Sequence, residues 1–323
     1  MDYKMGNKPQ PDIAVLIPCY NEELTIADVV ADYKREFPEA RIMVLDNNST
    51  DNSAELAAQA GATVAPVLKQ GKGAVIRHIF REIDADVYLT VDGDGAIPAT
   101  CAHDLIPPIL NGFDMAMGDR LTSGAYAREN KRRFHSLGNQ LVCALINKCF
   151  NSNIKDAMCG YRAFSKRFAK NIPVLSDGFQ VETEMTIRCI DRKLPYVTVP
   201  VEFQNRPKGS FSKLHTFRDG SRVLATIFTI LKNYRPLLFF GMFSIIFFVL
   251  GLFFGIPVLH EFYNYQRVTL AASAILATGL VLISAIFLIC ALILDTFVSY
   301  ERQRNELNVL RFDTKQRRAK YDD

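Results

Sequence analysis

Several features that mark common protein classes are missing from this sequence of 323 residues. It contains no tryptophan, which excludes any motif that requires one, such as Gln-x-x-Arg-Trp. Its seven cysteines form no CxxC pair, so they indicate buried thiols in a reducing compartment and neither a disulfide framework nor a zinc site. The formal net charge is only +4, which gives no reason to expect a nucleic-acid partner.

Charged residues are also missing from two long stretches, residues 237–259 and 268–294. Each stretch exceeds the roughly 20 apolar residues that are needed to cross a bilayer as a helix. The polar residues 260–267 between them are expected to form a short loop. We therefore predict a hairpin of two transmembrane helices over residues 236–295. The alternative is a pair of core helices in a soluble domain, but such helices rarely lack charge over these lengths.

Positive charges lie on one side of this hairpin, and the loop carries only Arg267. The lysines and arginines that flank the two spans on the other side are Lys232, Arg235, Arg302, Arg304, Arg311, Lys315, Arg317, Arg318 and Lys320. By the positive-inside rule we predict a multi-pass protein of the inner (plasma) membrane with both termini in the cytoplasm. Residues 1–11, which carry no secretory signal, are expected to be a disordered tail, and residues 296–323 a basic cytoplasmic tail.

The segment before the hairpin, residues 215–235, has apolar residues near helical spacing with basic residues among them. Its apolar residues include Phe217, Leu224, Ile227, Phe228 and Leu231. This pattern predicts an amphipathic helix in the membrane interface, with an ordinary core helix as the alternative. Its position next to a membrane span favours the interface.

Residues 12–214 show apolar strands that alternate with helical patterns. The predicted strands include residues 12–18, 40–45, 63–67, 87–91 and 196–203, and the first predicted helices are residues 24–37, 53–60 and 74–82. Such alternation is typical of βαβ units, so we predict an α/β domain with a Rossmann-like, mostly parallel sheet. Residues 156–164 hold an acid, a turn and an arginine, and they are expected to lie between two helices.

The strand at residues 87–91 ends in Asp92, Gly93 and Asp94. In an open α/β sheet, ligands bind at the carboxyl ends of the strands. Two carboxylates at such a place repel each other unless a cation lies between them, and carboxylate oxygens suit Mg²⁺ or Mn²⁺. We therefore predict a metal and nucleotide site, at which Gly93 lets the backbone approach a bound group. The alternatives are a plain polar turn and an aspartyl-phosphate phosphatase, whose motif usually has Thr or Val where this chain has Ala96.

Further polar clusters follow other strands and helices of the domain. Residues 18–23 and Asp46 follow the first two strands. Residues 71–73, Gly-Lys-Gly, begin a helix and could receive an anion, although the spacing is not that of a P-loop. Two basic segments come later, one with Arg128, Lys131, Arg132, Arg133 and His135, and one with Arg206 and Lys213. Both segments could simply be solvated surface. The functional interpretation is that they bind the phosphate of a lipid or a nucleotide.

The ordered series of residues 17–23, 46–51, 71–73 and 92–94 resembles glycosyltransferase family 2, with its GT-A fold. Residues 118–120, 156–162 and 206–213 narrow the resemblance to the polyprenyl-phosphate glycosyltransferases. That group includes the dolichol-phosphate mannose synthases and the bacterial undecaprenyl-phosphate glucosyltransferases. The resemblance covers about residues 12–235, and the hairpin matches relatives with two C-terminal spans.

The resemblance implies roles for individual residues. The donor nucleoside would contact Pro18, Tyr20, Glu22 and Asp46, and Lys72 and Gly93 would belong to the same donor site. Asp92 and Asp94 would hold the diphosphate through Mg²⁺ or Mn²⁺. Donor or acceptor phosphates would meet Arg120, Arg206 and Lys213, and the lipid phosphate would meet Arg128 and Arg132 or Arg133. Asp156 is similar to the catalytic aspartate of the family, and would orient the acceptor or the metal site, or act as a base.

Two positions depart from the family pattern. Many relatives have Gln where this chain has Ala96, and Asp-Asp where it has Asp46 and Asn47. The resemblance implies an inverting transfer of a sugar, with UDP-glucose or UDP-N-acetylglucosamine favoured over GDP-mannose, to undecaprenyl or another polyprenyl phosphate for decoration of cell-envelope glycans. Homo-oligomers are possible partners. The alternatives are a processive polysaccharide synthase, which the missing tryptophan disfavours, and a membrane scaffold that binds nucleotide-sugar without turnover.

Overall fold

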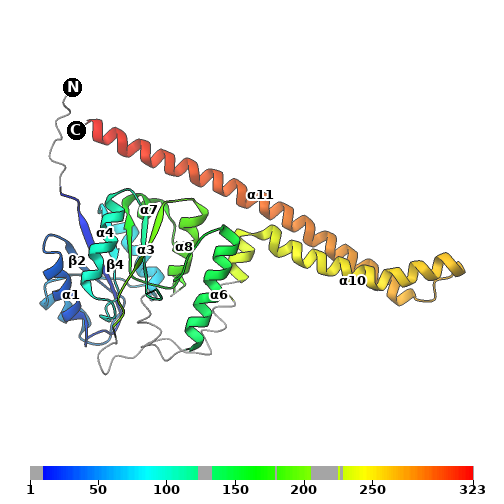
Figure 1. Cartoon of the computed structure of the whole chain (residues 1–323), viewed down its shortest axis with the longest axis horizontal. Coiled ribbons are helices and arrows are strands. Elements are labelled where there is room, and N and C mark those ends of the chain that lie inside the picture. Colours follow the sequence, from blue (N-terminus) through cyan, green and yellow to red (C-terminus); the bar gives the residue numbers. More distant parts are fainter. Residues whose placement is uncertain (1–9, 123–132, 179, 205–224, 226–227, 323) are drawn as a thin grey trace. The chain divides into compact units, whose positions relative to one another are not determined.

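The computed structural model describes residues 10–122, 133–178, 180–204, 225 and 228–322 (Figure 1). The chain divides into two compact units. One comprises Met1–Gly220 with Asn308–Asp323, and the other comprises Ser221–Leu307. Each unit has its own architecture, an α/β sheet in the first and a helical hairpin in the second.

A seven-stranded sheet forms the centre of the first unit, with the order β3-β2-β1-β4-β6-β5-β7. The strands are β1 (Ile13–Cys19), β2 (Arg41–Asp46), β3 (Thr63–Pro66), β4 (Val87–Thr90), β5 (Met115–Asp119), β6 (Arg162–Ser165) and β7 (Tyr196–Pro200). Parallel pairs join β1 to β2 and β4, β2 to β3, and β5 to β7. The predicted α/β domain with a mostly parallel sheet is therefore confirmed.

Helices cover both faces of this sheet (Figure 1). They are α1 (Ile26–Glu36), α2 (Ser53–Gln59), α3 (Lys72–Glu82), α4 (Ala102–Leu110), α6 (Arg133–Phe150), α7 (Lys166–Asn171) and α8 (Val181–Asp191). Val15 and Ile17 of β1 pack in one core cluster with residues of α1 and α4. Ala14 and Leu16 alternate with them, point to the other face and are also fully buried. Burial on both faces explains why the central strands are apolar along their whole length.

Residues 156–164 lie between two helices, α6 and α7, as expected, but the segment also contains a strand that was not predicted. This strand, Arg162–Ser165, pairs antiparallel with β4 on one side and β5 on the other. With only four residues, β6 is too short to show a period of its own. Its strand conformation depends on two neighbours that lie far away in the sequence.

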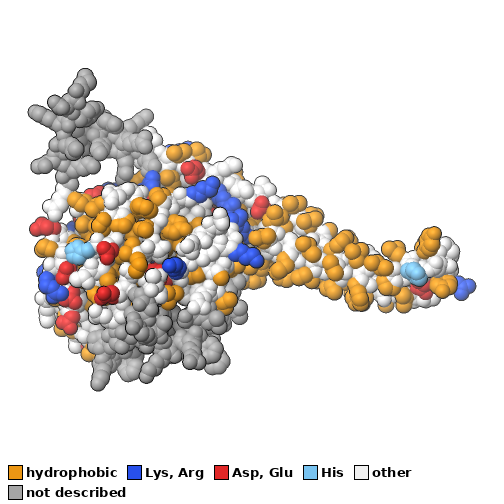
Figure 2. Space-filling model, viewed as in Figure 1, with side chains coloured by type: hydrophobic (Ala, Val, Ile, Leu, Met, Phe, Trp, Pro, Cys, Tyr) orange, Lys and Arg blue, Asp and Glu red, His pale blue; other side chains and the backbone are white. Residues whose placement is uncertain are grey.

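The second unit contains two long apolar helices, α10 (Pro236–Tyr265) and α11 (Ala271–Asp322). Both are long and apolar enough to cross a membrane, and only 17% of the most apolar window of each is buried. Figure 2 shows hydrophobic side chains over much of their visible surface. Such exposure of apolar side chains contradicts the alternative of soluble core helices.

The turn between these helices is shorter than predicted. Residues 260–265 continue α10, which ends where Gln266 adopts a left-handed conformation with φ of 52°. The Glu261 side chain accepts hydrogen bonds from the backbone N–H groups of Thr269 and Leu270, at 3.2 and 3.3 Å. Residues 260–265, which were predicted to form a loop, are therefore helical. A helix can continue beyond its apolar stretch, because its backbone hydrogen bonds do not require apolar side chains.

Close contacts join the two helices of the hairpin. Ser244 Oγ donates to the Ser284 carbonyl at 2.9 Å, and Ser284 Oγ donates back to the Ser244 carbonyl at 2.8 Å. A Cβ atom on Gly251 would lie 2.8 Å from Val281 Cγ2, so the backbones approach closely there. Small and hydroxyl residues at an interface are typical of helices that pack within a membrane.

The predicted amphipathic helix at residues 215–235 lies mostly outside the described residues. Ala225 and residues 228–234 are helical. Ile230 is buried, Phe228 is half-exposed, and the Phe228 ring contacts Phe239 edge-on with 4.8 Å between centroids. These few residues extend the apolar surface of the hairpin, and an interfacial position for the whole segment stays a prediction.

Candidate functional site

The carboxyl ends of β1, β2 and β4 bring the predicted donor residues to one edge of the sheet. Cys19 and Asp46 are register partners on β1 and β2, so the segment with Pro18, Tyr20 and Glu22 starts beside Asp46. The Val91 N–H donates to the Leu16 carbonyl at 3.0 Å, which keeps the chain beside β1 as it approaches Asp92. Three parallel strands therefore end together and place these side chains at a common edge.

The loop after β4 is held by hydrogen bonds within the domain. Thr25 Oγ1 of the α1 N-terminus donates to the Gly93 carbonyl at 2.7 Å. The Asp94 side chain, which is only 7% exposed, accepts a hydrogen bond from the Ala96 N–H at 3.0 Å through Oδ1. One oxygen of the Asp94 carboxylate is thus held by its own loop.

Lys72 lies between two carboxylates. Its Nζ is 2.6 Å from Asp92 Oδ1 and 2.7 Å from Glu182 Oε1. Burial alone would lower the pKa of Lys72, but the charges of Asp92 and Glu182 outweigh it and raise that pKa well above its ordinary value. Gly160 packs directly against this group, since a Cβ there would lie 2.5 Å from Lys72 Nζ and 2.8 Å from Asp92 Oδ2.

The residue types and their spacing do not predict a role for Glu182, which is buried beside Lys72 but lies 110 residues after it in the chain. The sequence signal is weak, because a carboxylate in the first turn of a helix is usually an ordinary N-terminal charge. Only the tertiary structure, which brings the first turns of α8 and α3 within ion-pair distance, shows that this carboxylate faces an ammonium group. The three charges together form a fixed ion cluster at the edge of the donor site.

Two of the three backbone amides of residues 71–73 already have acceptors within the protein. The Gly73 N–H donates to the Asp177 carbonyl at 3.0 Å, and the Gly71 N–H donates to Asn47 Oδ1 at 2.7 Å. A Cβ on Gly73 would lie 2.0 Å from the Ser176 carbonyl oxygen, so this glycine permits close packing of the chain. The amides of Gly71 and Gly73 are therefore occupied, and an anion site at residues 71–73 stays a prediction.

A second ion pair forms around the residue that follows β5. Arg120 Nε and Nη2 donate to the two oxygens of Asp156, at 2.8 and 3.0 Å. Asn139 Nδ2 of α6 donates to Asp156 Oδ1 at 2.9 Å. Asp156 is fully buried, and 14% of the Arg120 side chain is exposed. Burial alone would raise the pKa of Asp156, but the Arg120 charge and the hydrogen bonds from Arg120 and Asn139 lower it below its ordinary value.

A buried arginine supports the segment that carries Asp156. Arg162 at the start of β6 is fully buried and donates to the carbonyls of Cys159 and Ala157, at 2.7 and 2.9 Å. It also donates to Thr186 Oγ1 of α8 at 2.9 Å. Because these contacts use backbone carbonyls, Arg162 fixes the path of the chain between Asp156 and Gly160.

Two aspartates are too few to hold a divalent cation by themselves. Among the described residues, no group of three or more His, Cys, Asp or Glu side chains could hold a metal ion. Mg²⁺ and similar ions are often bound by one or two carboxylates together with substrate phosphates. Asp92 and Asp94 fit that mode, in which the nucleotide diphosphate supplies the remaining oxygens.

Several predicted phosphate ligands lie outside the described residues, namely Arg128, Arg132, Arg206 and Lys213. Arg133 begins α6, and its side chain is also outside the description. Their contacts with donor or acceptor phosphates therefore stay predictions. Of the predicted phosphate-binding arginines, Arg120 is described with its side chain, and it lies at the carboxyl end of β5.

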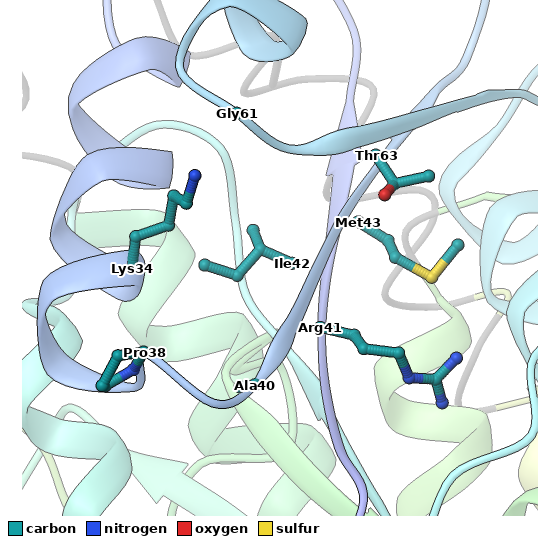
Figure 3. A pocket seen from close by; sticks show the side chains of 8 residues that line it. All are labelled: Lys34, Pro38, Ala40, Arg41, Ile42, Met43, Gly61 and Thr63. Atoms are coloured by element: carbon teal, nitrogen blue, oxygen red, sulfur yellow. The ribbon is translucent and has the colours of Figure 1, made fainter.

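A cavity of about 260 Å³ lies at the other edge of the sheet, at the amino end of β2. Lys34 of α1 and Ile42 line it on one side of β2, and Met43 and Thr63 line it on the other (Figure 3). Because Asp46 marks the opposite end of β2, this cavity is separate from the donor site.

Comparisons with known proteins place this geometry in a family. The family model described as glycosyl transferase family 2 matches residues 14–172. Glycosyltransferase AglJ of Haloferax volcanii is 32% identical over 301 residues, which are 92% of this chain and 97% of that protein. A dolichyl-phosphate hexose transferase of the same organism is 28% identical over 212 residues, which are 66% of this chain and 90% of that protein.

A solved structure with the same fold is glucosyl-3-phosphoglycerate synthase from Mycobacterium tuberculosis, in complex with Mn²⁺, UDP-glucose and phosphoglyceric acid. Its TM-score is 0.53 at 21% identity, over 69% of this chain and 79% of that chain. At this identity the likeness shows the fold, which is the GT-A arrangement that the sequence predicts.

Proposed function

This chain is a glycosyltransferase that belongs to family 2, and we propose that it transfers a sugar from a nucleotide-sugar to the phosphate of a polyprenyl lipid. The observation that supports this proposal is the combination of an Asp-Gly-Asp site at the carboxyl end of β4 with two apolar helices of membrane-spanning length in the same chain. A dolichyl-phosphate hexose transferase among the relatives supports the same class of acceptor.

On the donor side, Asp94 and Asp92 would hold Mg²⁺ or Mn²⁺ together with the diphosphate. Pro18, Tyr20, Glu22 and Asp46 would contact the nucleoside, and UDP-glucose and UDP-N-acetylglucosamine are the donors that we favour. The divalent cation would screen the charge of the leaving nucleoside diphosphate when it is bound. Lys72 keeps a positive charge beside Asp92, which limits the repulsion that an incoming diphosphate meets.

The reaction is a single displacement at the anomeric carbon. A phosphate oxygen of the lipid forms the new bond to that carbon while the bond to the donor diphosphate breaks, and the nucleoside diphosphate leaves with the electron pair. The configuration at the anomeric carbon therefore inverts. An ionised phosphate oxygen carries no proton, so this step depends on holding two anionic groups in line and needs no strong base.

The membrane supplies the acceptor. We propose that α10 and the first part of α11 span the inner membrane and that the catalytic unit lies on the cytoplasmic side, because Lys232, Arg235 and the basic residues after the second span flank the hairpin at one end. The lipid phosphate sits at the height of the headgroups. An enzyme anchored there meets its acceptor by diffusion within the membrane plane.

The test uses the full chain in lipid nanodiscs with undecaprenyl phosphate, Mn²⁺ or Mg²⁺, and a panel of labelled nucleotide-sugars. We expect label in a lipid-linked monosaccharide with one donor, and loss of that label in Asp94→Asn. Asp86→Asn is the matched control, since Asp86 precedes the same strand that Asp94 follows. A polymer product would indicate a processive synthase, and nucleotide-sugar binding without transfer would indicate a scaffold.

A further inference from the structure

The carboxylate of Asp156 is surrounded by donors. Oδ2 accepts from Arg120 Nε at 2.8 Å and from the Arg120 backbone N–H at 3.4 Å. Oδ1 accepts from Arg120 Nη2 at 3.0 Å, from Asn139 Nδ2 at 2.9 Å and from the Met158 N–H at 3.2 Å. A carboxylate has about four lone-pair positions, so these five donors occupy all of them.

The Asp156 carboxylate, with its acceptor positions occupied, is poorly suited to accept a proton. A general base must come within about 3.2 Å of the proton that it removes and must ionise near the working pH. Asp156 is fully buried, and its pKa is held below the ordinary value chiefly by Arg120, against the effect of burial. To take a proton it would have to give up an ion pair on both oxygens.

Arg120 is the member of the pair that reaches the site. It follows β5 directly, at the carboxyl edge of the sheet, and part of its side chain is exposed. Paired hydrogen bonds from Nε and Nη2 fix the plane of a guanidinium group, which makes it a directed ligand for a phosphate. The Asp119 side chain accepts from the N–H groups of Leu121 and Thr122, at 2.9 and 3.1 Å, and so sets the turn in which Arg120 lies.

Asn139 completes the cluster from α6. It is 3% exposed, and while Nδ2 donates to Asp156, its Oδ1 accepts from the Ala157 N–H at 3.3 Å. The amide therefore binds both the side chain of Asp156 and the backbone that follows it. Through Asn139, α6 and the loop after β5 are joined at one buried carboxylate.

We propose that Asp156 is a positioning residue that acts through Arg120, that Asn139 is a second positioning residue for the same arginine, and that neither moves a proton in the reaction. This inference rests on the proposed transfer of sugar to a lipid phosphate. It disfavours the base role that the resemblance allows for Asp156, and it names Arg120 as the group that Asp156 orients. It also assigns a role to Asn139, which the sequence does not mark.

A double-mutant cycle tests the proposal in nanodiscs, with undecaprenyl phosphate and the donor that labels it. We expect Arg120→Gln to lower kcat/KM about 100-fold, as for other lost charge-stabilising donors. Asp156→Asn should lower it about tenfold, and the double variant should be no worse than Arg120→Gln within about threefold, because residues that act as a unit are not additive. If Asp156 were the base, the two losses would multiply.

The pH profile gives a second readout, which separates an orienting role of Asp156 from a base role. If Asp156 only orients Arg120, wild type and Asp156→Asn keep the same acid limb in log kcat/KM against pH, since that limb belongs to the lipid phosphate. A base role predicts that the acid limb disappears in Asp156→Asn. Loss of the limb, or multiplication of the two losses in the double variant, overturns the proposal.

Two further variants separate an effect on positioning from a loss of stability. Asn139→Ala keeps the carboxylate, and we expect about a threefold loss of kcat/KM that vanishes in the Arg120→Gln background. Asp114→Asn is the matched control, because Asp114 is 1% exposed and pairs with Arg167 at the opposite end of β5. It should lower Tm without changing kcat/KM. A wild type that labels no lipid with any donor would refute the proposed function, whereas additive losses in an active enzyme refute only the role of Asp156.

Discussion

Replacement of Lys72 by methionine should destabilise the catalytic unit strongly. The variant leaves Glu182, whose side chain is only 5% exposed, without its cation. Lys72 Nζ and Glu182 Oε1 are 2.7 Å apart, so at an effective dielectric constant of about 20 their Coulomb attraction is roughly 6 kcal/mol before desolvation. Desolvation of the ammonium group offsets part of that gain. We therefore expect a loss of about 3 kcal/mol, the lower end of what removal of one buried partner costs.

Asp92 also pairs with Lys72, but 42% of its side chain is exposed, so water can solvate this carboxylate once the ammonium group is removed. The buried Glu182 thus dominates, and the double variant Lys72→Met/Glu182→Gln should lose only about 1 kcal/mol, since the carboxylate that remains unpaired, Asp92, is partly solvated. Lys166→Met is the matched control. Lys166 Nζ lies 2.7 Å from Asp84, the same distance, but both side chains are far more exposed.

The assay is thermal unfolding of the full chain in detergent, followed by circular dichroism at pH 7. For a unit of this size, about 3 kcal/mol corresponds to a fall in Tm of roughly 6–12 °C. Lys166→Met should change Tm by less than about 2 °C. If Lys72→Met and the double variant fall by the same amount, Glu182 is not the residue that needs the ammonium group, and the reasoning is wrong.

The pH dependence of this effect follows from the raised pKa of Lys72. A group whose pKa is higher in the folded state contributes its full stability below its unfolded value, about 10.4 for lysine. That stability is lost as the pH rises further toward the folded value. The difference in Tm between wild type and Lys72→Met should therefore be constant from pH 7 to about 9 and shrink above about 10.5.

Three other predictions follow from single contacts. The pKa of Asp156 is lower in the folded state than its ordinary value of 3.8. The ionised carboxylate therefore stabilises the fold above pH 3.8, and this contribution is lost as the pH falls through the pKa of the folded state. Acid unfolding of wild type should accordingly be steeper below pH 3.8 than that of Asp156→Asn. Gly160→Ala should displace Lys72 from Asp92 and lower kcat/KM at least about tenfold, and unchanged kinetics would disprove the close approach at this glycine. Ser244→Ala with Ser284→Ala removes the reciprocal hydrogen bonds of the hairpin and should cost about 1 kcal/mol in detergent-induced unfolding, with no loss if the two serines face lipid.

Local patterns in the sequence were enough to predict much of this fold. The strands that became β1 and β4 are continuous apolar runs, and the hairpin is a pair of uncharged stretches, so each could be recognised from neighbouring residues alone. Asp92 and Asp94 follow such a strand directly. Because parallel strands end at a common edge, their place at the same edge of the sheet as Asp46 also followed from the order of elements.

The tertiary structure alone decided which residues far apart in the sequence become partners. Glu182 meets Lys72, Asn139 meets Asp156, and Arg162–Ser165 becomes a strand between β4 and β5. The neighbouring residues in the sequence predict none of these contacts. A polar side chain in a helix occurs in many surroundings, and so does an apolar segment of four residues. Apolar periodicity determines which face of an element is buried. The pairing of buried charges depends on which elements pack together, and that information exists only once the chain has folded.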